Sequence, residues 1–410
     1  MSGYDYEFLT LETIPDYVRA HPALAERIDP DRLVSVDEIG DGNLNLVFTL
    51  EDAEGRRLVL KQALPYVRMV GDGWPMTPER ALREVRSLRT HRALAGELVV
   101  EVIDHDPERF IIAMEDLSDH AVWRHALNRG EVHDGAAAAL GRYVAAVAFG
   151  TSVLGMDRTE QAHALAESVN PELCIITEDL VFTEPSVDAG RNVVLPANEP
   201  DARAIAQDDV FVDAMGLAKW KFMTQAEALI HGDLHTGSVF VRAPEGSTEC
   251  DSVKVFDSEF AFYGPVAFDL GATYANYAFA AARALALGEQ DRFEWALGLS
   301  RQTWEAFEAE FRSRFEGVVD GRVWRAAMLE TLLENWSREA WLFAAAKMSR
   351  RIVGAAKVKD VETLPENLRE GAARGVLAAA RAAAAAWDAS HEPGDFGELV
   401  GEKLLEHRTA

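Results

Sequence analysis

The sequence predicts an α+β protein of two lobes. The N-terminal lobe has an antiparallel sheet and one main helix, and the C-terminal lobe is mostly helical. The chain has 410 residues, more than a single hydrophobic core usually holds. Runs with strand periodicity gather in residues 33–114, and long segments of helix-forming composition dominate the remainder. The expected division places residues 1–117, including an N-terminal helical extension, in the first lobe and residues 118–410 in the second.

The first lobe is expected to begin with a polar helical extension over residues 1–32, and its sheet follows. One helix comes after the third strand. It begins near Thr77 and Pro78, because threonine can cap a helix and proline suits the first helical position. This helix carries Glu84 and ends before Gly96. The five strands are predicted at residues 33–39, 44–50, 58–64, 99–103 and 110–114.

The second lobe is expected to be helical with one short interruption. Strand-like pieces occur at residues 238–241 and 253–256, and residues 184–200 form a loop rich in Pro, Asn and Gly. The predicted helices span residues 136–154, 209–229, 292–315, 323–354 and 368–389.

Composition excludes several classes of protein. The formal net charge of −27 argues against nucleic-acid binding, which needs basic surface facing phosphates. No apolar stretch is long enough for a membrane span, and residues 1–12 do not have the pattern of a signal peptide. Two cysteines, Cys174 and Cys250, cannot build a disulfide framework, so a cytoplasmic location is expected.

Carboxylates are placed as phosphoryl transfer requires. Asp233 lies in a loop before a short strand, where it can face a reacting hydroxyl, and a strand near Val255 delivers Asp257 and Glu259 into a second loop. One carboxylate can orient or deprotonate the nucleophile while the others hold Mg²⁺ at the phosphates. Taken alone, Asp233 could be a cap and Asp257 a surface turn. A third interpretation makes His231, Asp233 and His235 metal ligands, provided that they converge on one ion.

Cations for the phosphates are sought in the predicted sheet. Lys61 stands near the end of the third strand, either as an edge charge with a buried stem or as a cation for the α- and β-phosphates. In the second case a helix carboxylate holds it, for which Glu84 is the candidate. Gly40 and Gly42 would let the first turn approach the phosphates closely, although most such turns are only hairpins.

Several segments resemble methylthioribose kinases, a group within the aminoglycoside-phosphotransferase and protein-kinase-like superfamily. The similarity runs from about residue 30 to residue 360, nearly the whole chain. The resemblance implies a two-lobed, protein-kinase-like fold. The segments are GDGNLNLVF at 40–48, KQALPYVR at 61–68, WPMT at 74–77, NPELC at 170–174, TEDLVFT at 177–183, ALIHGDLHTGS at 228–238 and EFAFYGP at 259–265.

The resemblance implies transfer of the ATP γ-phosphate to the 1-hydroxyl of 5-methylthioribose, in methionine salvage. Asp233 matches the catalytic carboxylate, and Asp257 and Glu259 match the pair that holds Mg²⁺, with Ser238 where many protein kinases have a metal-binding asparagine. The sugar side would include Asp233, His235 and Arg351, and a homodimer is implied. The residues expected at the nucleotide are Gly40, Gly42, Asn43, Asn45, Lys61, Trp74, Glu84, Glu115 and Leu117.

Arg350 and Arg351 are similar to a pair of arginines that the family places near the sugar and the transferred phosphate. The residues themselves support two interpretations: stabilisation of charge on a transferring phosphoryl group, or a charge pair at the end of a helix. Neighbouring helical residues point about 100° apart, so the two arginines share a site only near a helix end. Gly354 makes such an end plausible.

The chain departs from the family pattern in places. Ser258 replaces the usual proline between the two metal carboxylates, so a looser loop is expected, because proline fixes the backbone angle φ. Ser186 and Val266-Ala267 also differ from the family pattern. The departures leave open a kinase for another 5-modified ribose, such as 5-deoxyribose. Outside that class, an inactive nucleotide-binding relative should have lost an essential group, and a metal-dependent hydrolase would need zinc or manganese without ATP.

Overall fold

The computed structural model describes residues 4, 6–40, 44–67, 71–187 and 190–408. The chain forms two compact units. The first comprises Met1–His120 together with Lys254–Phe260, and the second comprises Ala121–Val253 together with Ala261–Ala410. The sequence-based division left residues 254–260 with the C-terminal lobe, whereas this short segment is part of the first unit.

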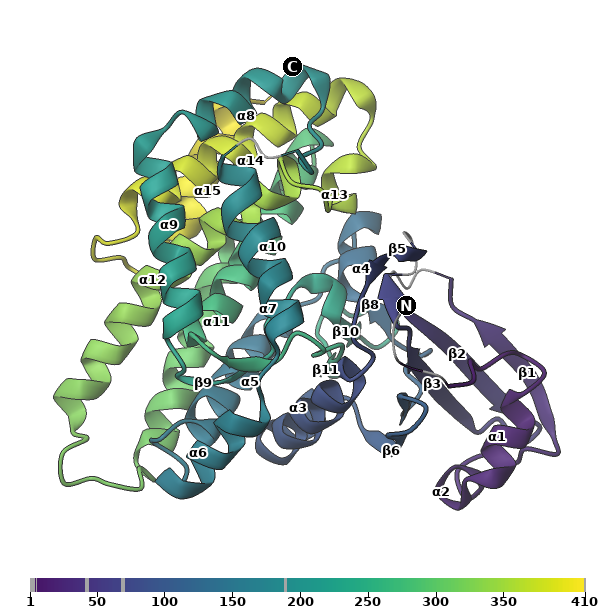
Figure 1. Cartoon of the computed structure of the whole chain (residues 1–410). Helices are drawn as coiled ribbons and strands as arrows, with labels where there is room; N and C mark the ends of the chain where they lie inside the picture. The colour runs from purple at the N-terminus through teal and green to yellow at the C-terminus, as the bar shows by residue number, and fades with distance from the viewer. Residues whose placement is uncertain (1–3, 5, 41–43, 68–70, 188–189, 409–410) are drawn as a thin grey trace. The chain divides into compact units, whose positions relative to one another are not determined.

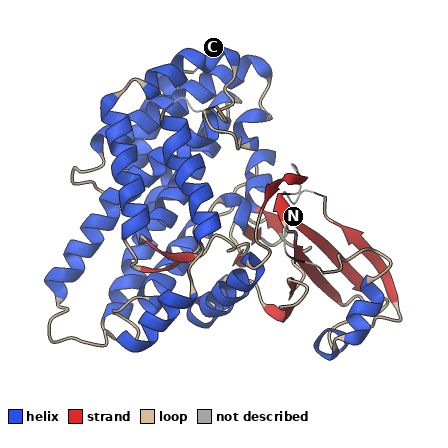
Figure 2. Ribbon diagram, in the orientation of Figure 1, coloured by secondary structure: helices blue, strands red, loops and turns tan. Residues whose placement is uncertain are grey.

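The first unit contains a five-stranded antiparallel sheet, drawn with the other strands in red in Figure 2. The five predicted strands and the helix after the third strand, α3 (Arg80–Ala95), are confirmed, although the fourth strand begins three residues later than expected. A small hairpin of β4 (Tyr66–Val67) and β5 (Gly71–Pro75) was not predicted. The sheet has the order β1-β2-β3-β7-β6, with bounds β1 Leu33–Glu38, β2 Asn45–Asp52, β3 Arg57–Ala63, β6 Val102–Asp106 and β7 Ile111–Met114.

Two short N-terminal helices cover one face of this sheet, where they lie beside β1 and β2 in Figure 1. They are α1 (Ile14–Ala20) and α2 (Pro22–Ala25), so within the described residues the predicted extension over residues 1–32 is helical only between residues 14 and 25. Side chains alternate between the faces of a strand. Leu58 and Leu60 of β3 pack into the core with α1 and α2, and Lys61 therefore points to the opposite face, toward α3.

The second unit is mostly helical, and the five predicted helices are confirmed with small shifts of their ends. Helix α10 (Val266–Ala286) was not predicted, although it is buried over almost its whole length and packs against α11, α12 and α14 (Figure 1). The remaining bounds are α4 Trp123–Arg129, α5 Ala136–Thr151, α6 Arg158–Glu167, α7 Pro171–Thr177, α8 Glu199–Ala206, α9 Asp209–Thr224, α11 Gln290–Phe315, α12 Ala326–Ile352, α13 Lys359–Glu362, α14 Glu366–Ala386 and α15 Asp395–Glu406.

Short strands place the two loops that carry the predicted carboxylates. β9 (Ala228–Ile230) pairs with β12 (Phe262–Gly264), and β10 (Val239–Arg242) pairs with β8 (Ala121–Val122), so residues 231–238 are fixed at both ends. β11 (Ser252–Val255) leads into Asp257. Among the helices of the described ranges, none is long and apolar enough to span a membrane.

Candidate active site

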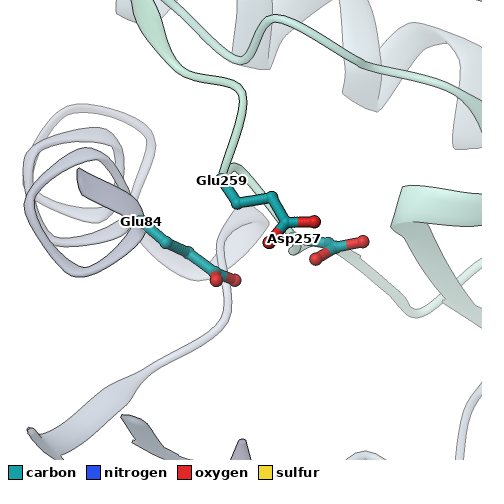
Figure 3. A group of neighbouring side chains, drawn as sticks. All are labelled: Glu84, Asp257 and Glu259. Atoms are coloured by element: carbon teal, nitrogen blue, oxygen red, sulfur yellow. The ribbon is translucent and has the colours of Figure 1, made fainter. Parts of the chain in front are cut away.

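Three carboxylates meet in the first unit. Glu84 extends from α3, and Asp257 and Glu259 extend from the loop that follows β11 (Figure 3). Each offers an oxygen within 4.8 Å of the others, and this is the only such group of three possible ligands among the described residues. The two carboxylates that the sequence assigned to Mg²⁺ are therefore neighbours, and Glu84 joins them.

Lys61 lies within this carboxylate group. Its Nζ donates hydrogen bonds to Glu84 at 2.8 Å and to Asp257 Oδ1 at 2.5 Å, and its side chain is buried. Burial alone would lower the pKa of Lys61, but the surrounding carboxylates, first Asp257 and then Glu84, outweigh it and raise that pKa. Burial raises the pKa of Glu84 to about 7, against the opposing effect of the Lys61 ammonium.

Glu259 and Asp257 differ in their surroundings. Glu259 is buried, and its Oε2 accepts hydrogen bonds from Arg80 Nε and Asn45 Nδ2, both at 3.2 Å. Arg80 is fully buried and also donates to the backbone carbonyls of three residues, Leu44, Leu64 and Thr77. Sequence reasoning overlooked Arg80. Its location near the start of an amphipathic helix gave no signal that it would turn inward.

Asp257 is the exposed member of the group, with 37% of its side chain accessible. Its backbone has φ +65°, in the left-handed region that aspartate tolerates better than most residues. A non-glycine residue held in that conformation is common at functional sites. Asp257 therefore has both the access and the unusual geometry that a ligand-binding residue needs.

Ser258 holds its loop to α3 through contacts with Ser87. Its Oγ lies 2.6 Å from Ser87 Oγ of α3, and Ser87 Oγ also lies 3.3 Å from the Ser258 carbonyl oxygen and 3.0 Å from that of Glu84. A looser loop was expected because the proline is missing. Instead, hydrogen bonds between Ser258 and Ser87 attach the loop to α3. This connection joins the helix that carries Glu84 to the loop that carries Asp257 and Glu259.

The other predicted nucleotide residues have mixed outcomes. Gly42 and Asn43 lie outside the described residues, Gly40 follows β1 and is exposed, and only the backbone of Trp74 is described, in β5. The Glu115 carboxylate accepts the backbone N–H of Glu101 at 2.8 Å and Lys254 Nζ at 3.0 Å, and Leu117 is buried. Asn45 contacts Glu259 and Arg80. The roles of these residues at a nucleotide stay predictions.

Asp233 stands in the loop between β9 and β10 of the second unit. Its backbone is set by Asp269 of α10, whose carboxylate accepts the N–H groups of His231 at 2.7 Å and Gly232 at 3.1 Å. Gly232 has φ +82°, which a residue with a Cβ would adopt only with strain. Lys347 of α12 donates to Asp233 Oδ1 at 2.7 Å, and His235 Nε2 lies 3.4 Å from Oδ2.

Cations dominate the surroundings of Asp233. Burial would raise its pKa, but the charges of Lys347, and then of Arg350 and Arg351, hold that pKa well below its ordinary value. Burial, then the charge of Arg124, keeps the pKa of His235 well below its usual range, so its imidazole is neutral at pH 7. The other ring nitrogen of His235, Nδ1, lies 3.2 Å from Ser238 Oγ.

Arg350 and Arg351 occupy the last turn of α12, which ends at Ile352, so the expected helix end is present. Arg351 donates to the Lys357 carbonyl oxygen at 3.5 Å. Arg350 Nε is buried and has no hydrogen-bond partner among the described residues. The charges of both side chains lower the pKa of Asp233.

Two further predictions concern metal ligands in the second unit. Ser238 lies against His235 and the Asp233 carbonyl oxygen, and its role at a metal stays a prediction. The alternative of a metal site from His231, Asp233 and His235 is not supported, because within the described residues these three side chains form no converging ligand group. Instead, His231 Nδ1 accepts the Asp233 backbone N–H at 3.3 Å.

Comparison with known proteins defines the class. The profile of the phosphotransferase enzyme family matches residues 35–309. The chain belongs to this family, which confirms the prediction of a phosphotransferase.

Within the family, the resemblance to methylthioribose kinases is confirmed. The methylthioribose kinase of Yersinia pseudotuberculosis serotype O:1b is 37% identical over 92% of each chain. That of Pectobacterium atrosepticum is 38% identical over 88% of this chain and 89% of its own. A choline/ethanolamine kinase family protein from Mesorhizobium loti aligns with 95% of this chain and 99% of its own, at a TM-score of 0.43 and 16% identity, a likeness too weak to support an argument.

Proposed function

We propose that this chain is an ATP-dependent sugar kinase that phosphorylates the 1-hydroxyl of 5-methylthioribose, giving 5-methylthioribose 1-phosphate and ADP in methionine salvage. The observation that carries the proposal is the 37% identity over 92% of the chain with a curated methylthioribose kinase. The partly buried Asp233, which accepts a hydrogen bond from Lys347, supports it from the chemistry of the site.

Asp233 is assigned to the acceptor hydroxyl. The hydroxyl oxygen forms a new bond to the γ-phosphorus as the bond to the β–γ bridging oxygen breaks, and the hydroxyl proton passes to the Asp233 carboxylate. Arg350 and Arg351 stabilise the negative charge that is carried by the transferring group. The buried Nε of Arg350, which has no partner within the described residues, supports this role because a phosphate oxygen would satisfy it.

The nucleotide and Mg²⁺ are assigned to the first unit. The oxygen donors of Asp257 and Glu259 suit Mg²⁺, which commonly binds one or two carboxylates together with phosphates. When bound, Mg²⁺ neutralises charge on the phosphates. Asp257 is the better candidate for direct contact because it is partly exposed, whereas Glu259 is buried against Arg80. Lys61, held by Glu84, supplies the cation for the α- and β-phosphates.

A coupled ADP-release assay tests the proposal. The purified protein is given ATP and Mg²⁺ with 5-methylthioribose, 5-deoxyribose or ribose, and phosphorus NMR identifies the product. The highest kcat/KM is expected for 5-methylthioribose, with a phosphate on C1. A preference for 5-deoxyribose would transfer the assignment to another 5-modified ribose. ADP release that needs no sugar, or none with any pentose, would contradict the proposal.

A cytoplasmic homodimer completes the proposal. The cytoplasmic location is supported by the cysteine content, because two cysteines, Cys174 and Cys250, cannot build a disulfide framework. The dimer is inferred from the family resemblance, and α9 carries four exposed apolar side chains that a second copy could bury: Val210, Leu217, Trp220 and Met223. Light scattering at micromolar concentration is expected to give twice the chain mass of 45.2 kDa, and a monomer there would exclude the dimer.

A further inference from the structure

Lys347 is a buried lysine that sequence reasoning did not select. It stands in α12 after Ala344, Ala345 and Ala346, all fully buried, and only 6% of its side chain is accessible. Burying an ammonium group is costly unless it is paired and hydrogen-bonded. Its Nζ has such a partner in Asp233 Oδ1, 2.7 Å away. The lysine is thus directed to the one carboxylate that the proposed reaction assigns to the acceptor hydroxyl.

The surroundings of Lys347 fix its position. Its Nζ lies 4.4 Å from the centroid of the Phe268 ring, within the range of a cation–π contact. Phe268 precedes Asp269, the residue that holds the backbone N–H groups of His231 and Gly232. The first turn of α10 therefore supports both the loop backbone and the lysine that holds the side chain of Asp233.

The three cations of α12 have different contacts. Lys347, Arg350 and Arg351 are three and four residues apart, so they share one side of the helix. Lys347 hydrogen-bonds Asp233, whereas Arg351 donates to a backbone carbonyl and Arg350 Nε has no partner within the described part of the chain. Lys347 therefore binds the Asp233 carboxylate, whereas N–H groups of the arginines are available to a ligand.

We propose that Lys347 is a positioning residue for phosphoryl transfer: it holds Asp233 Oδ1 and thereby directs Oδ2 toward the acceptor hydroxyl. This inference rests on the proposed function. Oδ2 has two lone pairs, so the neutral His235 at 3.4 Å leaves room for a hydroxyl. Burial lowers the pKa of Lys347 to about 8, so its ammonium form still predominates at pH 7.

The test compares Lys347→Met, which removes the charge at similar length, with Lys347→Arg, which keeps it. The matched control is Lys221→Met, because Lys221 forms a comparable ion pair with Glu339 at 2.7 Å and has no contact with Asp233. Misplacing a reacting group by about 1 Å can cost 10²-fold. Lys347→Met is therefore expected to lower kcat by about 10- to 100-fold with less than about threefold change in either KM. Lys347→Arg should recover part of the loss, and Lys221→Met should keep kcat within about twofold.

A double-mutant cycle separates positioning from a general loss of structure. If Lys347 acts through Asp233, Asp233→Asn with Lys347→Met should be no slower than Asp233→Asn alone. The inference is overturned if Lys347→Met keeps the wild-type kcat, or if the two losses multiply. If the wild type phosphorylates no pentose, the proposed function fails and the inference fails with it. If the wild type is active, Asp233→Asn is inactive and Lys347→Met is fully active, the inference about Lys347 fails while the proposed function stands.

Discussion

The two units carry charged groups of opposite balance. In the first, the carboxylates of Glu84, Asp257 and Glu259 face two cations, Lys61 and Arg80, and negative charge is in excess. In the second, Asp233 faces three cations, Lys347, Arg350 and Arg351. An excess of carboxylate suits a metal ion, and an excess of cations suits a phosphoryl group. A chain of net charge −27 needs such a local reversal where phosphate is to move.

The comparison also shows how neighbours decide the ionisation of a buried carboxylate. Burial is the largest influence on both Glu84 and Asp233, and it favours the neutral acid in each. The pKa of Glu84 stays raised because Asp257 and Glu259 add to the effect of burial. The pKa of Asp233 falls because the charges of Lys347, Arg350 and Arg351 together outweigh the effect of burial. A weakly basic Asp233 fits phosphoryl transfer, in which positioning and charge stabilisation matter more than early proton removal.

The largest effect is expected for Asp233→Asn. Asparagine keeps the shape of the side chain but can neither accept the proton nor hold the charge that Lys347 and the arginines face. General acid–base catalysis contributes about 10²–10⁴-fold, so kcat should fall by at least 10²-fold while ATP binding, measured by calorimetry, is kept. A variant with more than about a tenth of the wild-type kcat would exclude Asp233 as the general base.

The roles of the two proposed Mg²⁺ ligands of the first unit can be distinguished by comparing Asp257→Ala with Glu259→Ala. Both should raise the Mg²⁺ concentration required for half-maximal activity. Loss of a group that supports a metal ligand typically costs about 10–100-fold in metal affinity, so we expect that range for Glu259 and at least its upper end for the exposed Asp257. An Mg²⁺ titration of ADP release measures both. An unchanged requirement in Glu259→Ala would make Glu259 a structural partner of Arg80.

A smaller effect is expected from the arginines of the second unit. Arg351→Ala, and likewise Arg350→Ala, should reduce kcat/KM for the sugar by more than about tenfold, equivalent to about 1.4 kcal/mol, with little change in the affinity for ATP. The physical reason is the loss of a cation that faces the transferring phosphoryl group. Initial-rate kinetics with each substrate varied in turn separate the two affinities. Wild-type sugar kinetics in both variants would leave the pair as charges at the end of a helix.

The parts of the fold that follow local periodicity could be predicted from the sequence. Strand-like periodicity located the first three strands of the sheet and placed Lys61 on the third, and two apolar runs indicated the other two. Helix α10 could not be found in this way. It is apolar on nearly every side because it is buried on nearly every side, so it has no polar face to reveal its period. The hairpin of β4 and β5 has too few residues to show a strand pattern.

The site was predictable where a motif carries the chemistry and unpredictable where tertiary contacts do. Asp233 and Asp257 stand in short, distinctive segments. Lys347, Arg80 and Asp269 acquire their roles only through partners 114, 179 and 38 residues away in sequence. A signal for Lys347 existed in hindsight: a lysine interrupts a run of apolar residues one turn before two arginines. A charge inside a buried helix face needs a partner, and that requirement is itself informative.

The smallest effect concerns the connection between α3 and the carboxylate loop. Ser258→Ala removes the 2.6 Å contact with Ser87 but leaves Ser87 Oγ able to donate to the carbonyl oxygens of Glu84 and Ser258. A hydrogen bond of this kind contributes about 0.5–1.5 kcal/mol, so the loss in the free energy of unfolding should lie in that range. Ser87→Ala removes the same contact and should cost as much or slightly more.

Because the two serines share one interaction, Ser87→Ala with Ser258→Ala should cost less than the sum of the single variants. Denaturant unfolding measures all three, and the Mg²⁺ titration shows whether the connection also serves the carboxylates. Strictly additive losses with an unaltered Mg²⁺ requirement would mean that the two hydroxyl groups do not act together, and that the other contacts of the loop, with Lys61, Arg80 and Asn45, hold the carboxylates.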